Sequence, residues 1–201
     1  VVAVTDDGGS SGRLRQAFDM PAPGDLTDCV AALAPDESEL SRLLDYRFER
    51  GAELEGHTFG NLLIATLDEV EGDFERAVRS LNQVLNLQGA AYPATGESVV
   101  LRAEKQDGVH VAGESAIRDF AGPVVRVTLD PPAPRAVPEV LMAIRGADLI
   151  VIGPGSLFSS ILPPLIVPEV LDAIRHSPAQ LVYVANLLHE PGETDEFTAM
   201  Q

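Results

Sequence analysis

The sequence predicts an α/β fold that contains a mostly parallel sheet and a small added β-hairpin element. The strongest observation is an internal repeat, because residues 137–145 (VPEVLMAIR) recur at residues 167–175 (VPEVLDAIR) and an apolar segment follows each copy. Helix, strand, helix and strand in this order form the crossover unit of a parallel sheet. A second observation is that polar loops follow the predicted strands, where such sheets place their ligands. The composition agrees, since 45% hydrophobic and 22% charged residues are typical of a globular chain.

The first half of the chain is mainly helical in its apolar periodicity. Residues 1–5 form a β-branched run that predicts a buried strand. The polar residues 6–12 predict a flexible loop, and a serine would cap the helix that follows. We expect helices over residues 13–18, over 26–33 with Asp25 as the N-cap, from Pro35 through 48, over 62–70, and over 74–85 with Asp73 as the N-cap.

The middle of the chain changes to the two-residue period of strands. Residues 98–104, 109–112 and 124–129 are predicted strands, and Asp107-Gly108 between the first two is typical of a hairpin turn. In the repeat that follows, Pro138 and Pro168 stand at the first helical position, where the missing N–H group costs nothing. The apolar segments after the two repeat helices, residues 148–152 and 181–185, are predicted to be buried strands.

The charge balance excludes several classes of protein. Lys and Arg number 14 against 31 Asp and Glu, so the net charge is −17, which argues against a binder of nucleic acid. A single cysteine, Cys29, and four histidines argue against a disulfide scaffold and a cysteine-rich zinc site. The sequence holds no apolar run long enough to cross a membrane. We therefore expect a cytoplasmic protein without membrane insertion, and a homo-oligomer remains one option.

We expect a single α/β domain over residues 1–201, incomplete at both ends. The sequence opens without Met inside an apolar run and stops shortly after a loop. The missing start also means that the lack of a visible signal peptide proves little.

Three polar loops follow predicted strands and are therefore the candidate ligand site. They are residues 6–12, residues 153–156, and Asn186 with the nearby residues 191–194. The carboxyl ends of parallel strands lie on one edge of a sheet, so we expect the three loops to converge there.

The loop over residues 6–12 joins two carboxylates to glycine-freed backbone N–H groups. Asp6 or Asp7 could bind a divalent cation, and the helix N-terminus that follows could bind phosphate. The alternative is a loop whose Asp and Ser side chains only cap a helix.

The other polar candidates leave alternatives open. Residues 153–156 (GPGS) let the backbone approach a ligand closely, or form an ordinary strand-to-helix turn. His57 could bind phosphate or act as an acid or base, or could be a structural histidine bonded to the backbone. Cys29 lies on a predicted helix and is better explained as a core residue. No Ser/His/Asp order or CxxC pattern supports a nucleophilic mechanism, so we assign no catalytic residue.

Seven segments together resemble the CofD/YvcK family, which comprises the 2-phospho-L-lactate transferases and the gluconeogenesis-factor-like proteins. They occur in family order over almost the whole chain, and the first segment and residues 153–157 are closer to the YvcK branch. The matching segments are residues 6–15, 24–26, 56–57 with 60–63, 93–95, 113–115, 147–157, and 186–187 with 191–194.

The resemblance implies a Rossmann-like fold with helices on both faces of the sheet and a ligand cleft at the strand ends. For the YvcK branch it implies binding of nucleotide-sugars such as UDP-N-acetylglucosamine, with roles in central carbon metabolism and cell shape. For the transferase branch it implies Mg²⁺-dependent transfer of a phospholactyl group from a guanosine diphosphate-linked donor to a deazaflavin.

The resemblance also implies a set of site residues. The partner would be a nucleotide-diphosphate-linked small molecule, with Mg²⁺ as the one cofactor to consider. The sequence departs from the family pattern at Asp28 and Pro164, where Asn is usual, and at His189-Glu190, where Thr-Gln is usual. The expected ligand-binding residues are Asp6, Asp7, Gly8, Gly9, Ser10, Ser11, Arg13, His57, Asn61, Gly153, Gly155, Ser156 and Asn186, of which Asp6 and Asp7 would also bind the metal.

Overall fold

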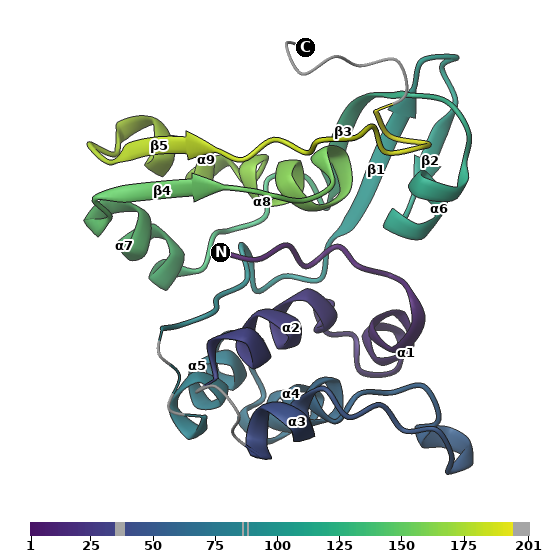
Figure 1. The fold of residues 1–201 in the computed structure, drawn as a ribbon, viewed down its shortest axis with the longest axis vertical. Helices are drawn as coiled ribbons and strands as arrows, with labels where there is room; N and C mark the ends of the chain where they lie inside the picture. Colours follow the sequence, from purple (N-terminus) through teal and green to yellow (C-terminus); the bar gives the residue numbers. More distant parts are fainter. Residues whose placement is uncertain (35–38, 86, 88, 195–201) are drawn as a thin grey trace. The chain divides into compact units, whose positions relative to one another are not determined.

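The computed structural model describes residues 1–34, 39–85, 87 and 89–194, and confirms the α/β class (Figure 1). The chain forms two compact units, Val1–Ser98 and Val99–Gln201.

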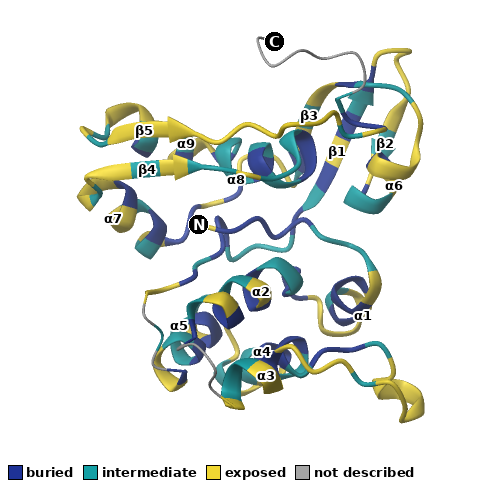
Figure 2. Ribbon diagram, in the orientation of Figure 1, coloured by how far each residue is buried: buried dark blue, intermediate teal, exposed yellow. Residues whose placement is uncertain are grey.

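The first unit is built from helices around one apolar core (Figure 2). The core forms where the apolar stripes of α2, α4 and α5 meet, and Leu26, Ile64 and Leu81 are completely buried in it. The helices are α1 (Gly9–Phe18), α2 (Gly24–Leu33), α3 (Glu39–Leu44), η1 (Ala52–Leu54), α4 (Phe59–Glu71) and α5 (Phe74–Val84).

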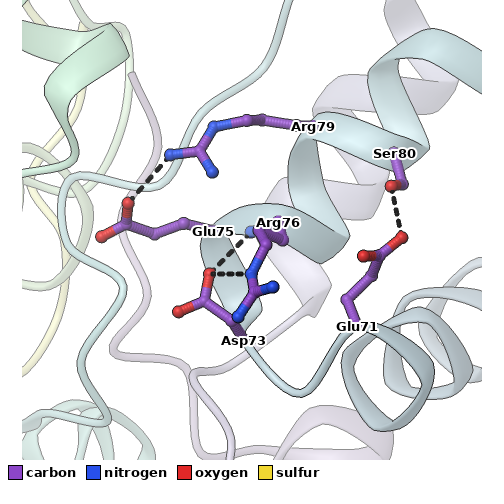
Figure 3. Close-up of polar contacts among 6 residues, drawn as sticks. All are labelled: Glu71, Asp73, Glu75, Arg76, Arg79 and Ser80. Carbon is purple, nitrogen blue, oxygen red and sulfur yellow. Dashed lines mark hydrogen bonds and ion pairs between the residues drawn. The ribbon is translucent and has the colours of Figure 1, made fainter.

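Side-chain caps fix the starts of α4 and α5. The Thr58 hydroxyl accepts a hydrogen bond from the Asn61 N–H group at 3.3 Å, which begins α4. Asp73 caps α5 as the sequence predicts, because its Oδ1 accepts the Arg76 N–H group at 2.9 Å (Figure 3). The Ser80 hydroxyl donates to Glu71 Oε1 at 2.8 Å and so ties α5 to the end of α4.

Three expectations for the first unit are wrong or lie outside the described residues. Residues 1–5 form only an isolated parallel bridge between Val2 and Pro93, in which the Val2 N–H group donates to the Tyr92 carbonyl oxygen and the Ala94 N–H group donates to the Val2 carbonyl oxygen, both at 2.9 Å. Asp25 does not cap α2, since the helix begins at Gly24 and Pro23 takes the cap position. The helix start predicted at Pro35 lies outside the described residues.

The second unit contains a three-stranded antiparallel sheet in the order β2-β1-β3. The strands are β1 (Val100–Lys105), β2 (His110–Ala112) and β3 (Val124–Asp130), and the short helix α6 (Glu114–Asp119) follows β2. The predicted turn at Asp107-Gly108 joins β1 to β2.

One face of this small sheet is buried and holds a lysine. Leu101, Ala103 and Lys105 alternate with exposed or half-buried residues along β1, and Lys105 is only 1% exposed. Its ammonium group donates to the carbonyl oxygens of Ile117 at 2.8 Å, Phe120 at 2.9 Å, Gly122 at 3.0 Å, and Gly192. This cage binds the segment around Gly192 to the sheet.

The repeat forms two helices and two parallel strands, as the sequence predicts. Proline is the first residue of both α7 (Pro138–Gly146) and α9 (Pro168–His176), and β4 (Leu149–Ile152) pairs with β5 (Gln180–Tyr183) in parallel. Between β4 and α9 the chain forms η2 (Leu157–Ile161), which is a π-helix, and α8 (Leu162–Leu165).

The prediction that both parallel strands are buried is wrong. Leu149 is 51% exposed and Tyr183 is 54% exposed, and β5 is exposed along its whole length (Figure 2). Within the described residues the parallel sheet has only two strands. A sheet this small has no neighbouring strands to bury its edges, so these apolar side chains stay exposed.

Among the described residues no single helix has the length and apolar character needed to span a membrane. One bent pair, Leu157–Leu165 with Pro168–His176, passes that test only when its two parts are taken together.

Candidate functional site

The glycine-rich segment of the first unit is helical over most of its length. The loop ends at Gly8, and α1 begins at Gly9, so the expectation of a flexible loop through Gly12 is wrong. The expectation of a serine cap is also wrong, because Gly8 is the N-cap and its carbonyl oxygen accepts the Gly12 N–H group at 3.0 Å. Ser10 and Ser11 therefore lie in the first turn of α1, whose N–H groups have no partner inside the helix.

Close packing explains two glycines around this turn. A Cβ atom at position 12 would lie 2.1 Å from the Asp7 carbonyl oxygen. A Cβ atom at Gly24, the first residue of α2, would lie 2.4 Å from Ser11 Oγ and 2.7 Å from Asp6 Oδ2. Glycine is therefore required here by contacts within the protein, and the starts of α1 and α2 lie against each other and against Asp6.

A buried polar network connects the first turn of α1 to the start of α4. Ser10 Oγ lies 2.8 Å from His57 Nδ1 and accepts a hydrogen bond from Asn61 Nδ2 at 3.1 Å. The Thr27 hydroxyl donates to Asn61 Oδ1 at 2.5 Å. All four side chains are buried, so the network holds Ser10 in place from three other elements. The structure thus brings together three predicted residues that are far apart in the sequence, and it adds Thr27, which sequence reasoning missed.

Burial and two nearby charges favour the neutral form of the His57 imidazole. Burial lowers its pKa, and the charges of Arg13 and Arg47 lower it further. A neutral imidazole can accept a hydrogen bond from the Ser10 hydroxyl group at Nδ1, while the serine oxygen accepts one from Asn61 Nδ2. The sequence left open whether His57 binds phosphate, acts as an acid or base, or bonds to the backbone. In the structure the partner of its Nδ1 atom is the Ser10 side chain and not a backbone group.

Carboxylates gather beside the same turn. Asp6 Oδ1 accepts the Gly8 N–H group at 2.8 Å, which shapes the loop before α1. Burial raises the pKa of Asp25 to about 6, and the negative charges of Asp6 and Asp28 add to the rise. Burial also raises the pKa of Asp28. The mutual repulsion of these groups is what a bound divalent cation would relieve.

The predicted metal ligands Asp6 and Asp7 do not form a closed metal site by themselves. Among the residues that the structure describes, no group of three or more His, Cys, Asp or Glu side chains is arranged to hold a metal ion. Mg²⁺ is commonly held by one or two carboxylates together with ligand phosphates and water, so the carboxylates present fit that mode of binding.

In the second unit, the loop over residues 153–156 meets Asn186. Gly153 has a φ of 86°, and a Cβ atom there would lie 2.7 Å from the Val184 carbonyl oxygen, so glycine is required. Asn186 Nδ2 donates to the Gly155 carbonyl oxygen at 2.8 Å. Two of the three predicted polar loops therefore come together.

Two glutamates occupy the hydrogen-bond donors of this loop. Neither was among the expected ligand-binding residues, although Glu193 lies in the candidate loop over residues 191–194. The Ser156 hydroxyl donates to Glu190 Oε1 at 2.7 Å, and the Leu157 N–H group donates to Glu190 Oε2 at 3.3 Å. The Phe158 N–H group donates to the buried carboxylate of Glu193 at 3.1 Å. The hydroxyl and N–H donors of this loop, which were expected to bind a ligand, therefore donate to carboxylates of the chain itself. The signal that could have found them is the acidic residue on each side of Pro191-Gly192.

The predicted site residues therefore form one group in each unit. Asp6 through Arg13, His57 and Asn61 lie in the first unit, and Gly153, Gly155, Ser156 and Asn186 lie in the second. That the two groups share one ligand stays a prediction. A hollow of ≈ 380 Å³ on the outer face of the three-stranded sheet, lined by Arg102, Glu104, His110 and Arg126 among others, contains none of these residues.

The fold and the two polar loop groups define an α/β protein with glycine-rich turns at its helix starts. The chain belongs to the 2-phospho-L-lactate transferase CofD family, whose model matches residues 1–201. This confirms the resemblance seen in the sequence.

Individual relatives carry the name gluconeogenesis factor. The gluconeogenesis factor of Bacillus subtilis is 46% identical over 199 residues, which cover 99% of this chain and 63% of that protein. A protein of Deinococcus radiodurans is 54% identical over 197 residues, which cover 97% of this chain and 42% of that protein. A crystal structure of a Bacillus halodurans protein matches with a TM-score of 0.95 at 46% identity, covering 99% of this chain and 64% of that one. The chain thus spans less than two thirds of the length of these relatives.

Proposed function

We propose that this chain is the nucleotide-sugar-binding part of a regulatory protein of the gluconeogenesis-factor type, with a UDP-sugar as its ligand. The regulated processes would be central carbon metabolism and cell morphogenesis. The observation that carries the proposal is the buried Ser10, His57 and Asn61 network, which holds the first turn of α1 in a fixed conformation beside the Asp6 loop.

The chemistry of this turn suits a diphosphate. Free N–H groups at a helix start and the positive end of the helix dipole favour an anion. Asp6 and Asp7 would add Mg²⁺ between the protein and the phosphates, which suits a chain of net charge −17.

Isothermal titration calorimetry tests the proposal. UDP-N-acetylglucosamine, UDP and GDP are each titrated into the protein with and without Mg²⁺. Heat with the UDP compounds, increased by Mg²⁺, supports the proposal. Binding of GDP compounds without any response to UDP-sugars refutes it.

A second candidate is the transferase reaction after which the family is named. The carboxylates around Asp6 and Asp25 favour it, because a cation held there would stabilise charge on a leaving phosphate. The assay combines the deazaflavin acceptor, the guanosine diphosphate-linked donor and Mg²⁺ with the folded protein. Formation of the phospholactyl product supports this candidate, and its absence with a folded protein removes it.

A further inference from the structure

Two arginines donate hydrogen bonds to adjacent carbonyl groups of the loop that carries His57. Arg13 of α1 donates from Nη2 to the Glu55 carbonyl oxygen at 2.7 Å. Arg47 donates from Nη1 to the Gly56 carbonyl oxygen, also at 2.7 Å. Arg13 and Arg47 are far apart in the sequence, yet both are anchored on one short stretch of backbone. Both side chains are exposed, so their remaining N–H groups are accessible.

Glycine at position 56 makes this arrangement possible. Gly56 has a φ of 82°, a backbone conformation that side chains other than glycine rarely adopt. A Cβ atom at this position would lie 3.0 Å from Arg13 Nη2. The loop is therefore shaped to let the Arg13 guanidinium lie directly on its backbone.

The two guanidinium charges are not balanced by ion pairs. In the part of the chain that the structure describes, Arg76, Arg79, Arg102 and Arg118 each pair with a carboxylate, whereas Arg13 and Arg47 pair with none. Asp28 is near enough to Arg47 for its pKa to be affected, but the two form no ion pair. A carbonyl oxygen orients a guanidinium without cancelling its charge. The two cations are anchored on adjacent carbonyl groups of one loop and therefore keep their charge, in a chain whose net charge is −17.

Both cations also act on the same neighbour. His57 lies directly after the two gripped carbonyls, and the charges of Arg13 and Arg47 both lower its pKa. Through Ser10, His57 touches the first turn of α1, where the helix dipole adds partial positive charge.

We infer that Arg13 and Arg47 form an anion-binding pair that takes a phosphate group of the ligand. The inference rests on the proposed function and deepens it, because it names the side chains that recognise the diphosphate. Guanidinium groups suit this task, since their planar N–H donors match the oxygens of phosphate in pairs. Their anchors on the Glu55 and Gly56 carbonyls fix them before a ligand arrives, which reduces the ordering cost of binding.

The test compares charge-removing variants with a matched control. Arg13→Gln and Arg47→Gln each remove one guanidinium. Arg50→Gln removes an exposed arginine three residues from Arg47 and serves as the control. Calorimetry measures the binding of inorganic pyrophosphate, UDP and uridine to each protein. Urea unfolding of each variant shows whether it is folded.

We expect Arg13→Gln and Arg47→Gln each to weaken pyrophosphate and UDP binding by about tenfold or more, while Arg50→Gln stays near the unaltered protein. NMR should show amide shifts at Glu55, Gly56 and His57 when pyrophosphate is added. If a glutamine variant fails to fold, Arg→Lys at the same position keeps the charge but loses the paired donors, and it should weaken binding to a smaller extent.

The outcomes separate this inference from the proposed function. If the unaltered protein binds a UDP-sugar but the Arg13 and Arg47 variants bind pyrophosphate and UDP as well as the Arg50 control does, the arginine pair is refuted and the proposed function stands. If uridine binding falls as much as UDP binding, the arginines do not recognise phosphate and the pair is again refuted. If the unaltered protein binds neither pyrophosphate, UDP nor UDP-sugars, both proposals are refuted.

Discussion

Asp25 makes the stability of the protein depend on pH in a direction opposite to that of a salt-bridged carboxylate. It lies in the first turn of α2, where the helix dipole would favour its charge, yet burial and the charges of Asp6 and Asp28 raise its pKa to about 6. A carboxyl whose folded pKa is raised stabilises the fold while it is protonated. That stabilisation is lost as the pH rises from the unfolded pKa of 3.8 through the folded value of about 6.

The magnitude follows from the size of the shift. Roughly two pKa units correspond to about 3 kcal/mol, of which about half is lost between pH 5 and pH 8. Asp25→Asn cannot ionise, so its free energy of unfolding should gain about 1.5 kcal/mol relative to the unaltered protein over that pH range. Urea unfolding at several pH values, in the presence of EDTA to exclude divalent cations, measures this difference.

A control comes from Asp119, whose side chain is 78% exposed. Asp119→Asn removes an exposed carboxyl group and shows how much of any effect comes from the substitution chemistry alone. The reasoning is refuted if the stability gained by Asp25→Asn does not increase between pH 5 and pH 8, or if Asp25→Asn becomes less stable than the unaltered protein as the pH rises.

Three further predictions concern the packing of each unit. Gly12→Ala should destabilise the protein by about 2 kcal/mol or more in urea unfolding, because the new Cβ atom would collide with the Asp7 carbonyl oxygen. Gly146→Ala is the control and should be neutral or slightly stabilising, because a Cβ atom at that position in α7 would meet open space. Lys105→Met should lower the free energy of unfolding by about 3 kcal/mol or more in the same assay, because it leaves the carbonyl oxygens of the cage without a donor. Limited proteolysis should then cut near Gly192. Resistance to proteolysis equal to that of the unaltered protein would contradict the role of the cage. Asp73→Ala should cost about 1 kcal/mol, because α5 loses its N-cap, and Asp73→Asn should restore most of that loss; an alanine variant of unchanged thermal stability would argue against the cap.

Much of the fold follows from local sequence patterns. Helical periodicity with an Asp cap predicted α5, and the Asp-Gly turn predicted the hairpin of β1 and β2. The repeat predicted both proline-started helices and the parallel pairing of β4 with β5. The caps and turns lie within a few residues of the elements that they specify, whereas the parallel pairing follows from a repeat with an offset of 30 residues.

The errors arise where contacts between distant segments outweigh local preference. Glycine and serine favour loops, yet Gly9 through Gly12 are helical because the first turn of α1 packs tightly against Asp7 and the start of α2. The burial of β4 and β5 was inferred from their apolar residues alone, and hydrophobicity does not say what covers a strand.

The candidate site shows the same division. Ser10 and His57 were chosen from motifs, but their direct contact joins residues 47 positions apart, and no local pattern encodes such a contact. The capping of residues 156–158 by Glu190 and Glu193 was missed for the same reason. Arg13 and Arg47 donate to the neighbouring carbonyl groups of Glu55 and Gly56, and no local pattern in the sequence indicates that these two arginines meet the same loop.

The carbonyl cage has a practical consequence, because Lys105 is the single lysine in the sequence. With this side chain 1% exposed, the native surface offers acylating dyes, amine cross-linkers and lysine-specific acetylation no side-chain amine to modify. Modification of Lys105 requires the surrounding backbone to open first. The rate at which an amine reagent labels Lys105 therefore measures how often the second unit unfolds locally around this residue.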